Sequence, residues 1–316
     1  MSSAVARLLD SRVLLVTGKG GTGKTTFSAA LAVVAAARGR RVILCEVDSQ
    51  RPSTEAIFQA AAPYEPAKVL PNLHLCNVHW DGALLTYLQR MIPSRRVVAL
   101  ILESAAIRRF LNALPGAREI VILSRIEHLA QDFDLVVVDM PASGHAFSLL
   151  DVTRSAMSLF RSGPVKQRAT ELIDGLILHK ETRVVFVALP EDMVVNETIE
   201  TFQRMKRFDL LGADPLVFLN RATLPTLADA ERELLAKLAG EPLEGSAREF
   251  VRAGLWEDRL EQATSEALQQ LGDALPEPPV LVPPTGAGGN PRAVVAGIAA
   301  YLGRQLGLTR RDLPWT

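Results

Sequence analysis

The sequence predicts an α/β fold with a mainly parallel, doubly wound sheet, and two observations carry this prediction. Short apolar runs typical of buried strands alternate along the chain with longer segments of helical periodicity. The first of these runs, Val13–Thr17, leads into a glycine loop that opens an alanine-rich helix. Since parallel strands need a crossover between them, usually a helix, this order favours a sheet covered by helices on both faces.

The composition indicates a globular protein without a charge bias. The chain has 316 residues, 48% of them hydrophobic, and Lys plus Arg equals Asp plus Glu at 35 each. This balance gives no general attraction to nucleic acid or anionic lipid. Cys45 and Cys76 are the only cysteines, which fits a reducing compartment, and the sequence shows neither a signal peptide nor a membrane-length apolar run. We therefore expect one cytoplasmic domain over residues 1–316, with no nucleic-acid partner and no integral membrane segment.

The first quarter of the chain predicts three strands and one long helix. After the strand Val13–Thr17, Lys24–Arg38 is a helix with apolar residues at helical spacing. Arg41–Val47 is β-branched and apolar and predicts the second strand. A loop with several prolines over Ala60–Pro71 precedes a third strand at Leu73–Val78.

The segment Leu84–Leu114 is helical and unusually apolar, and Pro93 divides it. Its apolar residues are too many for one amphipathic stripe, so it forms either packed core, which we favour, or an exposed groove for a hydrophobic partner. These residues are Leu84, Leu88, Met91, Val98, Leu102 and Phe110. Pro115-Gly116 breaks the segment before another helix that ends near Ala130. We therefore expect a helical subdomain inserted around residues 84–131.

The rest of the chain continues the alternation. Phe133–Val138 is an apolar strand ending at Asp139, and Pro141–Gly144 forms the turn after it, which is a Walker B arrangement. Helices at Leu149–Phe160 and Val165–Leu178 make up a helical segment over about 149–180. The remaining elements are a strand at Arg183–Leu189, a helix at Met193–Phe208, a strand at Leu216–Leu219, helices at Ala228–Ala239 and Ala247–Leu271, a strand at Val280–Val282, a loop at Pro283–Pro291 and a helix at Arg292–Leu306.

The glycine loop fits the pattern G-x-x-x-x-G-K-[ST] of a phosphate-binding P-loop. Its glycines let backbone N–H groups approach phosphate oxygens closely. Lys24 would contact the β- and γ-phosphates of a nucleotide, and the Thr25 hydroxyl would bind Mg²⁺. The residues predicted to bind the nucleotide are Gly18, Lys19, Gly20, Gly21, Thr22, Gly23, Lys24, Thr25 and Thr26. The alternative is a glycine turn before an ordinary helix.

Two aspartates end predicted strands, where parallel sheets place ligand contacts. Asp139 would hold Mg²⁺ directly or through water, the alternative being an aspartate in a strand-end turn. Asp48 follows the second strand, and a cap at the start of the next segment is its alternative role.

Gly18–Thr26 resembles the deviant Walker A loop of the dimeric ATPases that include ParA, MinD and the arsenite-pump ATPase. The distinguishing residue is Lys19, directly after the first glycine. In that group the extra lysine reaches across a dimer interface to the nucleotide of the other subunit. The resemblance therefore implies an ATP-dependent homodimer in which Lys19 acts beside Lys24, and a solvated loop lysine is the alternative.

The next matches narrow the resemblance to the ArsA and Get families, which are the arsenite-pump and tail-anchored-protein-targeting ATPases. Asp139–His145 is similar to their switch II motif, Asp-Thr-Ala-Pro-Thr-Gly-His. This similarity implies that Asp139, Ser143, Gly144 and His145 respond to the nucleotide. For His145, a bond to a nearby backbone group is an equal alternative.

The adenine and switch I positions complete the resemblance. Asn220 with Pro225 matches the Asn-x-x-x-x-Pro by which the family holds adenine, with Arg221 beside it, and a turn asparagine is the alternative. Asp48 falls where switch I supplies the aspartate that positions the attacking water near Mg²⁺. The segment Asp48–Pro52 departs from the family's Asp-Pro-Ala-His, so the geometry of water activation is atypical.

The resemblance implies an ATPase, with ATP and Mg²⁺ as cofactors, that couples its nucleotide state to capture and release of a hydrophobic protein client, for example a membrane protein. Arsenite is not the expected effector, because the chain has two cysteines and one lies in a predicted buried strand. Two alternatives stay open at this point. One is a ParA- or MinD-like positioning ATPase, and the other is a nucleotide-binding regulatory protein with little turnover.

Overall fold

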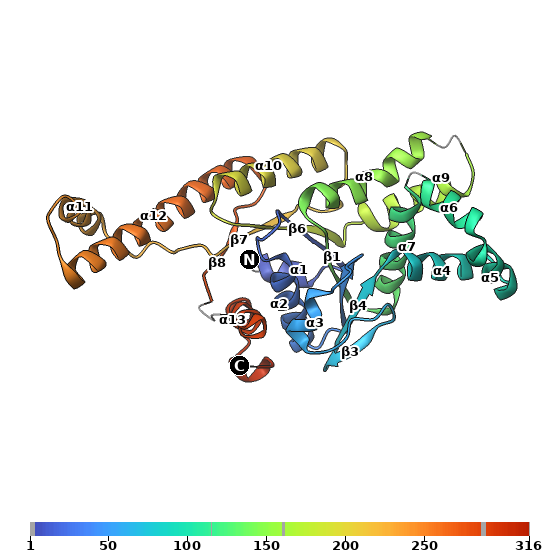
Figure 1. Ribbon diagram of the computed structural model, residues 1–316, viewed down its shortest axis with the longest axis horizontal. Coiled ribbons are helices and arrows are strands. Elements are labelled where there is room, and N and C mark those ends of the chain that lie inside the picture. Colours follow the sequence, from blue (N-terminus) through green and yellow to red (C-terminus); the bar gives the residue numbers. More distant parts are fainter. Residues whose placement is uncertain (1–3, 115, 160–161, 286–288, 316) are drawn as a thin grey trace.

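The chain folds around an eight-stranded sheet in the computed structural model, which describes residues 4–114, 116–159, 162–285 and 289–315. The strand order is β3-β4-β2-β5-β1-β6-β7-β8, and every pair is parallel except β3 with β4. The strands are β1 (Val13–Thr17), β2 (Val42–Val47), β3 (Ala67–Leu70), β4 (Leu73–Val78), β5 (Leu135–Asp139), β6 (Thr182–Ala188), β7 (Leu216–Asn220) and β8 (Val280–Val282). The predicted, mainly parallel sheet is therefore confirmed (Figure 1).

Alternate side chains of each strand enter two separate cores, because successive residues of a strand point to opposite faces. Leu14 and Val16 of β1 belong to one core, and Val13 and Leu15 belong to the other. The helices over the first core are α1 (Ala4–Leu9), α2 (Lys24–Ala37), α3 (Ser53–Phe58) and α13 (Pro291–Arg304). Burial on both faces explains why the strands read as continuous apolar runs.

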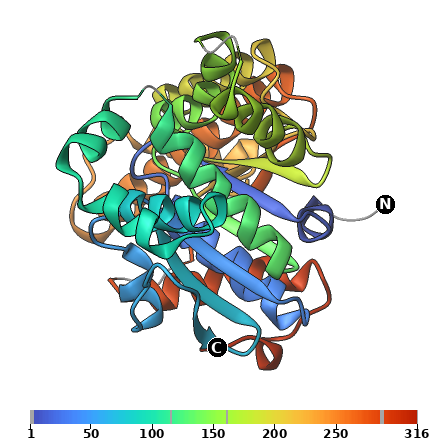
Figure 2. The same ribbon diagram turned by 90° about the vertical axis from the view of Figure 1, so that its right-hand side faces the viewer.

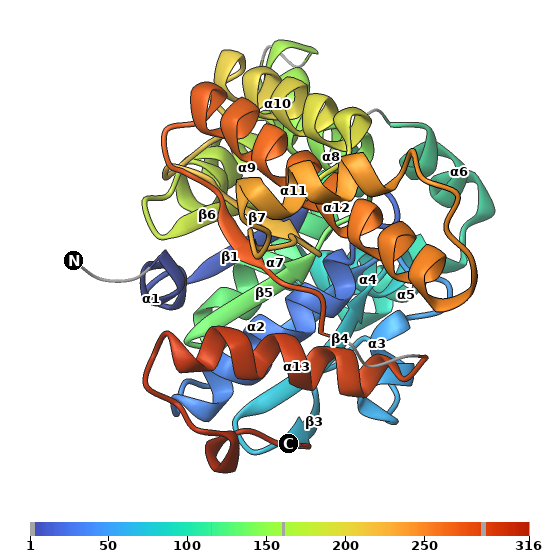
Figure 3. The same ribbon diagram turned by 90° about the vertical axis from the view of Figure 1, so that its left-hand side faces the viewer.

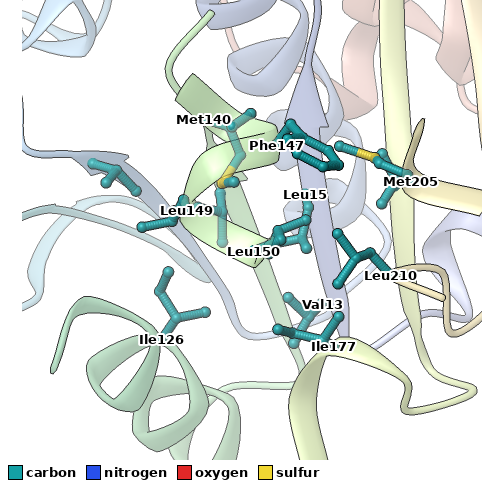
Figure 4. Packing of buried hydrophobic residues seen from close by; sticks show 14 of the residues in the cluster. Val13, Leu15, Ile126, Met140, Phe147, Leu149, Leu150, Ile177, Met205 and Leu210 are labelled. Atoms are coloured by element: carbon teal, nitrogen blue, oxygen red, sulfur yellow. The ribbon is translucent and has the colours of Figure 1, made fainter. Parts of the chain in front are cut away.

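The second core lies under a larger group of helices. These are α4 (Trp80–Met91), α7 (Ala117–Asp132), α8 (Ser143–Leu159), α9 (Pro164–Leu172) with a π-helical turn at Ile173–Ile177, α10 (Asp192–Arg207) and α12 (Gly245–Ala274). Figure 4 shows Leu15 of β1 beside Leu150 of α8, with Phe147 and Ile177 nearby. Each such leucine or phenylalanine contributes about 1.5–3 kcal/mol through burial, and this packing fixes the helices that border the site.

Three helices lie away from the sheet, at opposite ends of the molecule (Figure 1). α5 (Arg95–Glu103) and α6 (Ala105–Ala113) extend beyond α4 at one end, which Figure 2 faces. α11 (Asp229–Leu238) packs on the first half of α12 at the other end, which Figure 3 faces. A short 3₁₀ turn at Arg310–Asp312 follows α13.

Most predicted elements are confirmed to within a few residues, and several were missed. α1, α3 and β3 were not predicted. The predicted loop Ala60–Pro71 contains β3, an edge strand that the prolines around it concealed and that turns into β4 through Asn72 at φ 60°. Pro115, Phe160 and residues 286–288 of the predicted loop at 283–291 lie outside the described residues.

The turn predicted at Pro141–Gly144 is wrong in its second half. Helix α8 already begins at Ser143, so Ser143 and Gly144 belong to its first turn. A glycine is tolerated there because the first turn of a helix carries no obligatory intrahelical N–H bonds.

The apolar segment Leu84–Leu114 divides at Pro93 as predicted and again at Ser104, which separates α5 from α6. The preferred prediction of packed core is correct for Leu84 and Val98, which are 4% and 2% exposed. It is wrong for Met91 and Phe110, which are 56% and 62% exposed, because Met91 is the last residue of α4 and Phe110 lies on α6, at the end of the molecule away from the sheet.

Among the described residues, no helix combines the length and apolarity that crossing a bilayer would require.

Candidate functional site

The glycine loop joins β1 to α2, and two of its glycines sit where a side chain has no room. A Cβ on Gly18 would lie 2.2 Å from the carbonyl oxygen of Val187 on β6. A Cβ on Gly23 would lie 2.8 Å from the side-chain amide of Asn220, and the backbone of Gly23 is left-handed at φ 92°. Gly20 and Gly21 are exposed at the tip of the loop. The loop therefore packs closely on β6 and β7 and presents its tip outward.

Lys24 lies back over this loop. Its ammonium donates a hydrogen bond to the carbonyl oxygen of Lys19 at 3.1 Å. Burial lowers the pKa of Lys24, and the carboxylates of Asp139 and Glu197 act in the opposite direction. The amino group is thus held over the loop by backbone and charge, where phosphate would take the place of the carbonyl.

Asp139 ends β5 and is bound to the first turns of α2. One carboxylate oxygen accepts a hydrogen bond from the Thr25 hydroxyl at 2.5 Å, and the other accepts one from Ser28 at 3.3 Å. Burial raises the pKa of Asp139 to about 6, with the hydrogen bond from Thr25 opposing the shift and the nearby Glu46 adding to it. A cation here would restore the charge balance, and paired hydroxyl and carboxylate oxygens are ligands that suit Mg²⁺.

Lys19 is held by a carboxylate within the same chain. Its ammonium lies 3.5 Å from Glu197 of α10, and the other oxygen of Glu197 accepts a hydrogen bond from the Ser143 hydroxyl. The Ser143 N–H donates to the carbonyl oxygen of Gly18 at 3.1 Å. Glu197 therefore connects the loop to the start of α8. Gly144 and His145, the next residues of the helix, are exposed.

Asp48 follows β2 with a left-handed backbone at φ 54°, and its N–H donates to the carbonyl oxygen of Val78 at 2.9 Å. Its side chain forms an ion pair with Arg118 of α7. The alternative role as a helix cap is wrong, because the N-cap residue of α3 is Pro52 and the carboxylate that accepts the N–H groups of Ser53 and Thr54 is that of Glu46.

Asn220 ends β7 against the loop. Its amide NH₂ donates to the carbonyl oxygen of Thr22 at 2.9 Å, and its amide oxygen accepts the N–H of Arg221 at 3.0 Å. Arg221 itself has a left-handed backbone at φ 55°. The chain beyond is fixed to α12, because the buried Glu261 accepts both the N–H and the hydroxyl of Thr226 at 2.7 Å.

Comparison with known proteins shows to which family this chain belongs. A family model described as anion-transporting ATPase matches residues 11–163. The ATPase BagA of Mycobacterium tuberculosis is 30% identical over 264 residues, which cover 79% of this chain and 75% of that protein. The chain belongs to the ArsA ATPase family. The arsenical pump-driving ATPase of Acidiphilium multivorum is 26% identical over 71% of this chain and 41% of its own length.

In this member of the ArsA family, the sequence did not reveal the contacts by which three charged residues, Glu46, Arg118 and Glu197, touch the predicted site. Glu46 had a signal in the sequence, since it is an acidic residue inside an otherwise apolar strand. In the structure it pairs in register with Asp139. The contacts of Arg118 and Glu197 had no signal, because their partners are far away in the sequence: Arg118 and Asp48 are 70 residues apart, and Glu197 is 54 residues from Ser143 and farther still from Lys19. Such pairings exist only once the helices are packed.

The burial of Asp139 predicts a pH-dependent stability. The carboxyl ionises near pH 3.8 when unfolded and near 6 when folded, so folding disfavours the charged form. Without nucleotide and Mg²⁺, wild type should lose stability relative to Asp139→Asn as the pH rises from about 4 to about 6, by up to about 3 kcal/mol, and then level off. Urea unfolding of both proteins across this range measures the difference, with the exposed Asp273→Asn as the control. A difference that stays constant with pH would contradict the assignment.

Proposed function

We propose that the chain binds and hydrolyses ATP with Mg²⁺, and that its nucleotide state drives formation of a homodimer that captures and releases a hydrophobic protein client. The observation that carries the ATPase part is the convergence of Lys24 with the Thr25–Asp139 pair at the carboxyl edge of the sheet, in a chain of an ATPase family. Phosphate, metal and water would meet at this edge.

Each group has a distinct role in this proposal. The loop N–H groups and Lys24 bind the β- and γ-phosphates, and Asn220 and Arg221 hold the adenine. Thr25 and Asp139 hold Mg²⁺, which when bound neutralises phosphate charge, and Asp48 lies near the ion. Asp48 accepts a hydrogen bond from the attacking water and orients it toward the γ-phosphate, while Ser143, Gly144 and His145 respond to the presence of that phosphate.

Replacement of Lys24 tests nucleotide binding. Lys24→Ala should weaken ATP affinity by about tenfold to a hundredfold or more, since a hydrogen bond to a charged group contributes about 1.5–3 kcal/mol. Titration calorimetry with Mg²⁺ and ATP measures the affinity, and the exposed Lys180→Ala is the matched control. Equal ATP affinity in Lys24→Ala and wild type would remove the central proposal.

The homodimer part rests on Lys19. In the single chain the Lys19 side chain is 31% exposed and its ammonium lies 3.5 Å from Glu197, a weak pairing that a phosphate of a second subunit can replace. The same exchange would free Ser143 at the start of α8. In this proposal the carboxylate of Glu197 couples nucleotide binding and the dimer contact to the position of α8.

Sizing measurements test this role. With Mg²⁺ and ATP, the slowly hydrolysing Asp48→Asn variant should form a dimer, and adding Lys19→Ala should return it to a monomer while ATP still binds. Light scattering after gel filtration gives the mass, and Lys180→Ala again serves as the control. A monomer under every nucleotide condition, or a dimer that survives Lys19→Ala, would contradict the trans role of Lys19.

The client part rests on the exposed apolar surface of α4–α6, which we call the platform. Its members are Leu85, Met91, Val97, Leu100, Ile107 and Phe110, each between 38% and 66% exposed. A group of this size on one end of the molecule is typical of a binding surface. The C-terminal helix favours this function over membrane attachment, because Val295, Ile298 and Leu302 of α13 are buried in the core beneath it.

Changes on the platform test client capture. Asp48→Asn, purified with ATP from its native cell, should bring down client protein, and adding Leu100→Asp and Phe110→Asp should remove most of it, because both side chains would place a charge in an apolar contact. The pair Phe250→Asp and Trp256→Asp on α12 is a matched control, since both residues are equally exposed at the other end. Equal recovery with the platform variant would exclude the platform as the client site.

A further inference from the structure

The ion pair between Asp48 and Arg118 joins the predicted water-positioning carboxylate to α7, the helix on which the platform helix α4 packs. Arg118 lies in the first turn of α7, which follows the left-handed Gly116 at φ 83°. Along the rest of this helix, Ile120, Ile122 and Leu123 are at most 4% exposed. This buried packing ties α7 to the core under the sheet and places the Arg118 side chain, in the first turn of the helix, beside Asp48.

The position of Arg118 is unfavourable without its partner. The N-terminal end of a helix carries partial positive charge, so a cation in the first turn is repelled by the helix and an anion beside it is attracted. Asp48 supplies that anion. The pairing thus satisfies both the arginine and the end of α7, which explains why the carboxylate turns toward α7.

In this arrangement the ion pair with Arg118 hinders the carboxylate of Asp48 from orienting the attacking water, which is its proposed role. The guanidinium occupies one of its oxygens and, as a cation, weakens that carboxylate as an acceptor for a water proton. The backbone does not offer an easy alternative, since the Asp48 N–H is bonded to Val78 of the neighbouring strand β4. Release of the side chain therefore requires the ion pair to open.

We propose that Arg118 is a latch on Asp48, a positioning residue that keeps basal ATP hydrolysis slow until a shift at the start of α7 opens the ion pair. This inference rests on the proposed function. It names α7 as the connection between the platform and hydrolysis, because α4, the first platform helix, packs directly on α7. Occupation of the platform then has a physical route to the attacking water.

The latch predicts faster basal turnover when the charge of Arg118 is removed. For the full chain at saturating ATP with Mg²⁺, Arg118→Gln should raise kcat by about two- to fivefold, the range that opening an exposed ion pair supplies. Arg118→Lys should keep the slow rate, and Arg252→Gln, an exposed arginine on α12, should have no effect. The double variant Arg118→Gln with Asp48→Asn should be as slow as Asp48→Asn alone.

The dependence of kcat on ionic strength distinguishes the latch from a merely structural role of Arg118, which would leave that dependence unchanged. The two side chains are 55% and 30% exposed, so salt screens their attraction. Wild-type kcat should rise between about 20 and about 300 mM salt, and kcat of Arg118→Gln should rise less over the same range.

The outcomes separate the two proposals. Turnover of Arg118→Gln equal to or below that of wild type, with ATP still hydrolysed, would overturn the latch and leave the proposed function in place. Failure of wild type to bind ATP with Mg²⁺ would overturn the proposed function and the latch with it. Faster turnover that persists in the double variant would also overturn the latch, because the effect would then not pass through Asp48.

Discussion

The buried carboxylate of Asp139 is the constraint on which the site depends. A carboxylate in this surrounding is costly unless its oxygens are bonded, and the two bonds available both come from α2. This requirement fixes the first turns of α2 against the end of β5, and the glycine loop must then cross the short distance between β1 and α2. On its other side the loop packs against β6 and β7, which leaves no room for a side chain at Gly18 or at the left-handed Gly23. A glycine loop in this position is therefore as much a consequence of close packing as a phosphate cradle.

The same edge of the sheet gathers the other charged groups for a related reason. Parallel strands all end on one side, so β2, β5, β1 and β7 deliver Asp48, Asp139, the glycine loop and Asn220 to neighbouring places. Buried carboxylates near this edge accept hydrogen bonds from backbone N–H groups. Glu46 accepts them from the start of α3, and Glu261 accepts them from the loop beyond Asn220. The site is consequently supported from behind by buried carboxylates that take no part in the proposed chemistry.

How much of this could be predicted from the sequence depends on how local each signal is. The glycine loop, the strand ending at Asp139 and the alternation of strands with helices are local patterns, and these led to the sheet and to the positions of the candidate residues. The antiparallel β3 was hidden by prolines, and the exposure of Met91 and Phe110 depends on where the end of α4 and helix α6 lie relative to the sheet. The partners of Asp48 and Lys19 could not be predicted, because Arg118 and Glu197 reach them only through helix packing.

Those two partners share a property that bears on how the chain would respond to a nucleotide. Lys19 is proposed to act on the nucleotide of the other subunit, and Asp48 is proposed to orient the attacking water. Within the single chain, Lys19 pairs with Glu197 and Asp48 pairs with Arg118, and both partners lie on helices that cover the second core. Both pairs are partly exposed, so each contributes at most about 1 kcal/mol. A triphosphate brings several negative charges to this edge and competes easily with interactions of that size. The single chain is thus held in its resting arrangement by contacts weak enough to be exchanged for ligand, while the buried bonds around Asp139 keep the framework unchanged.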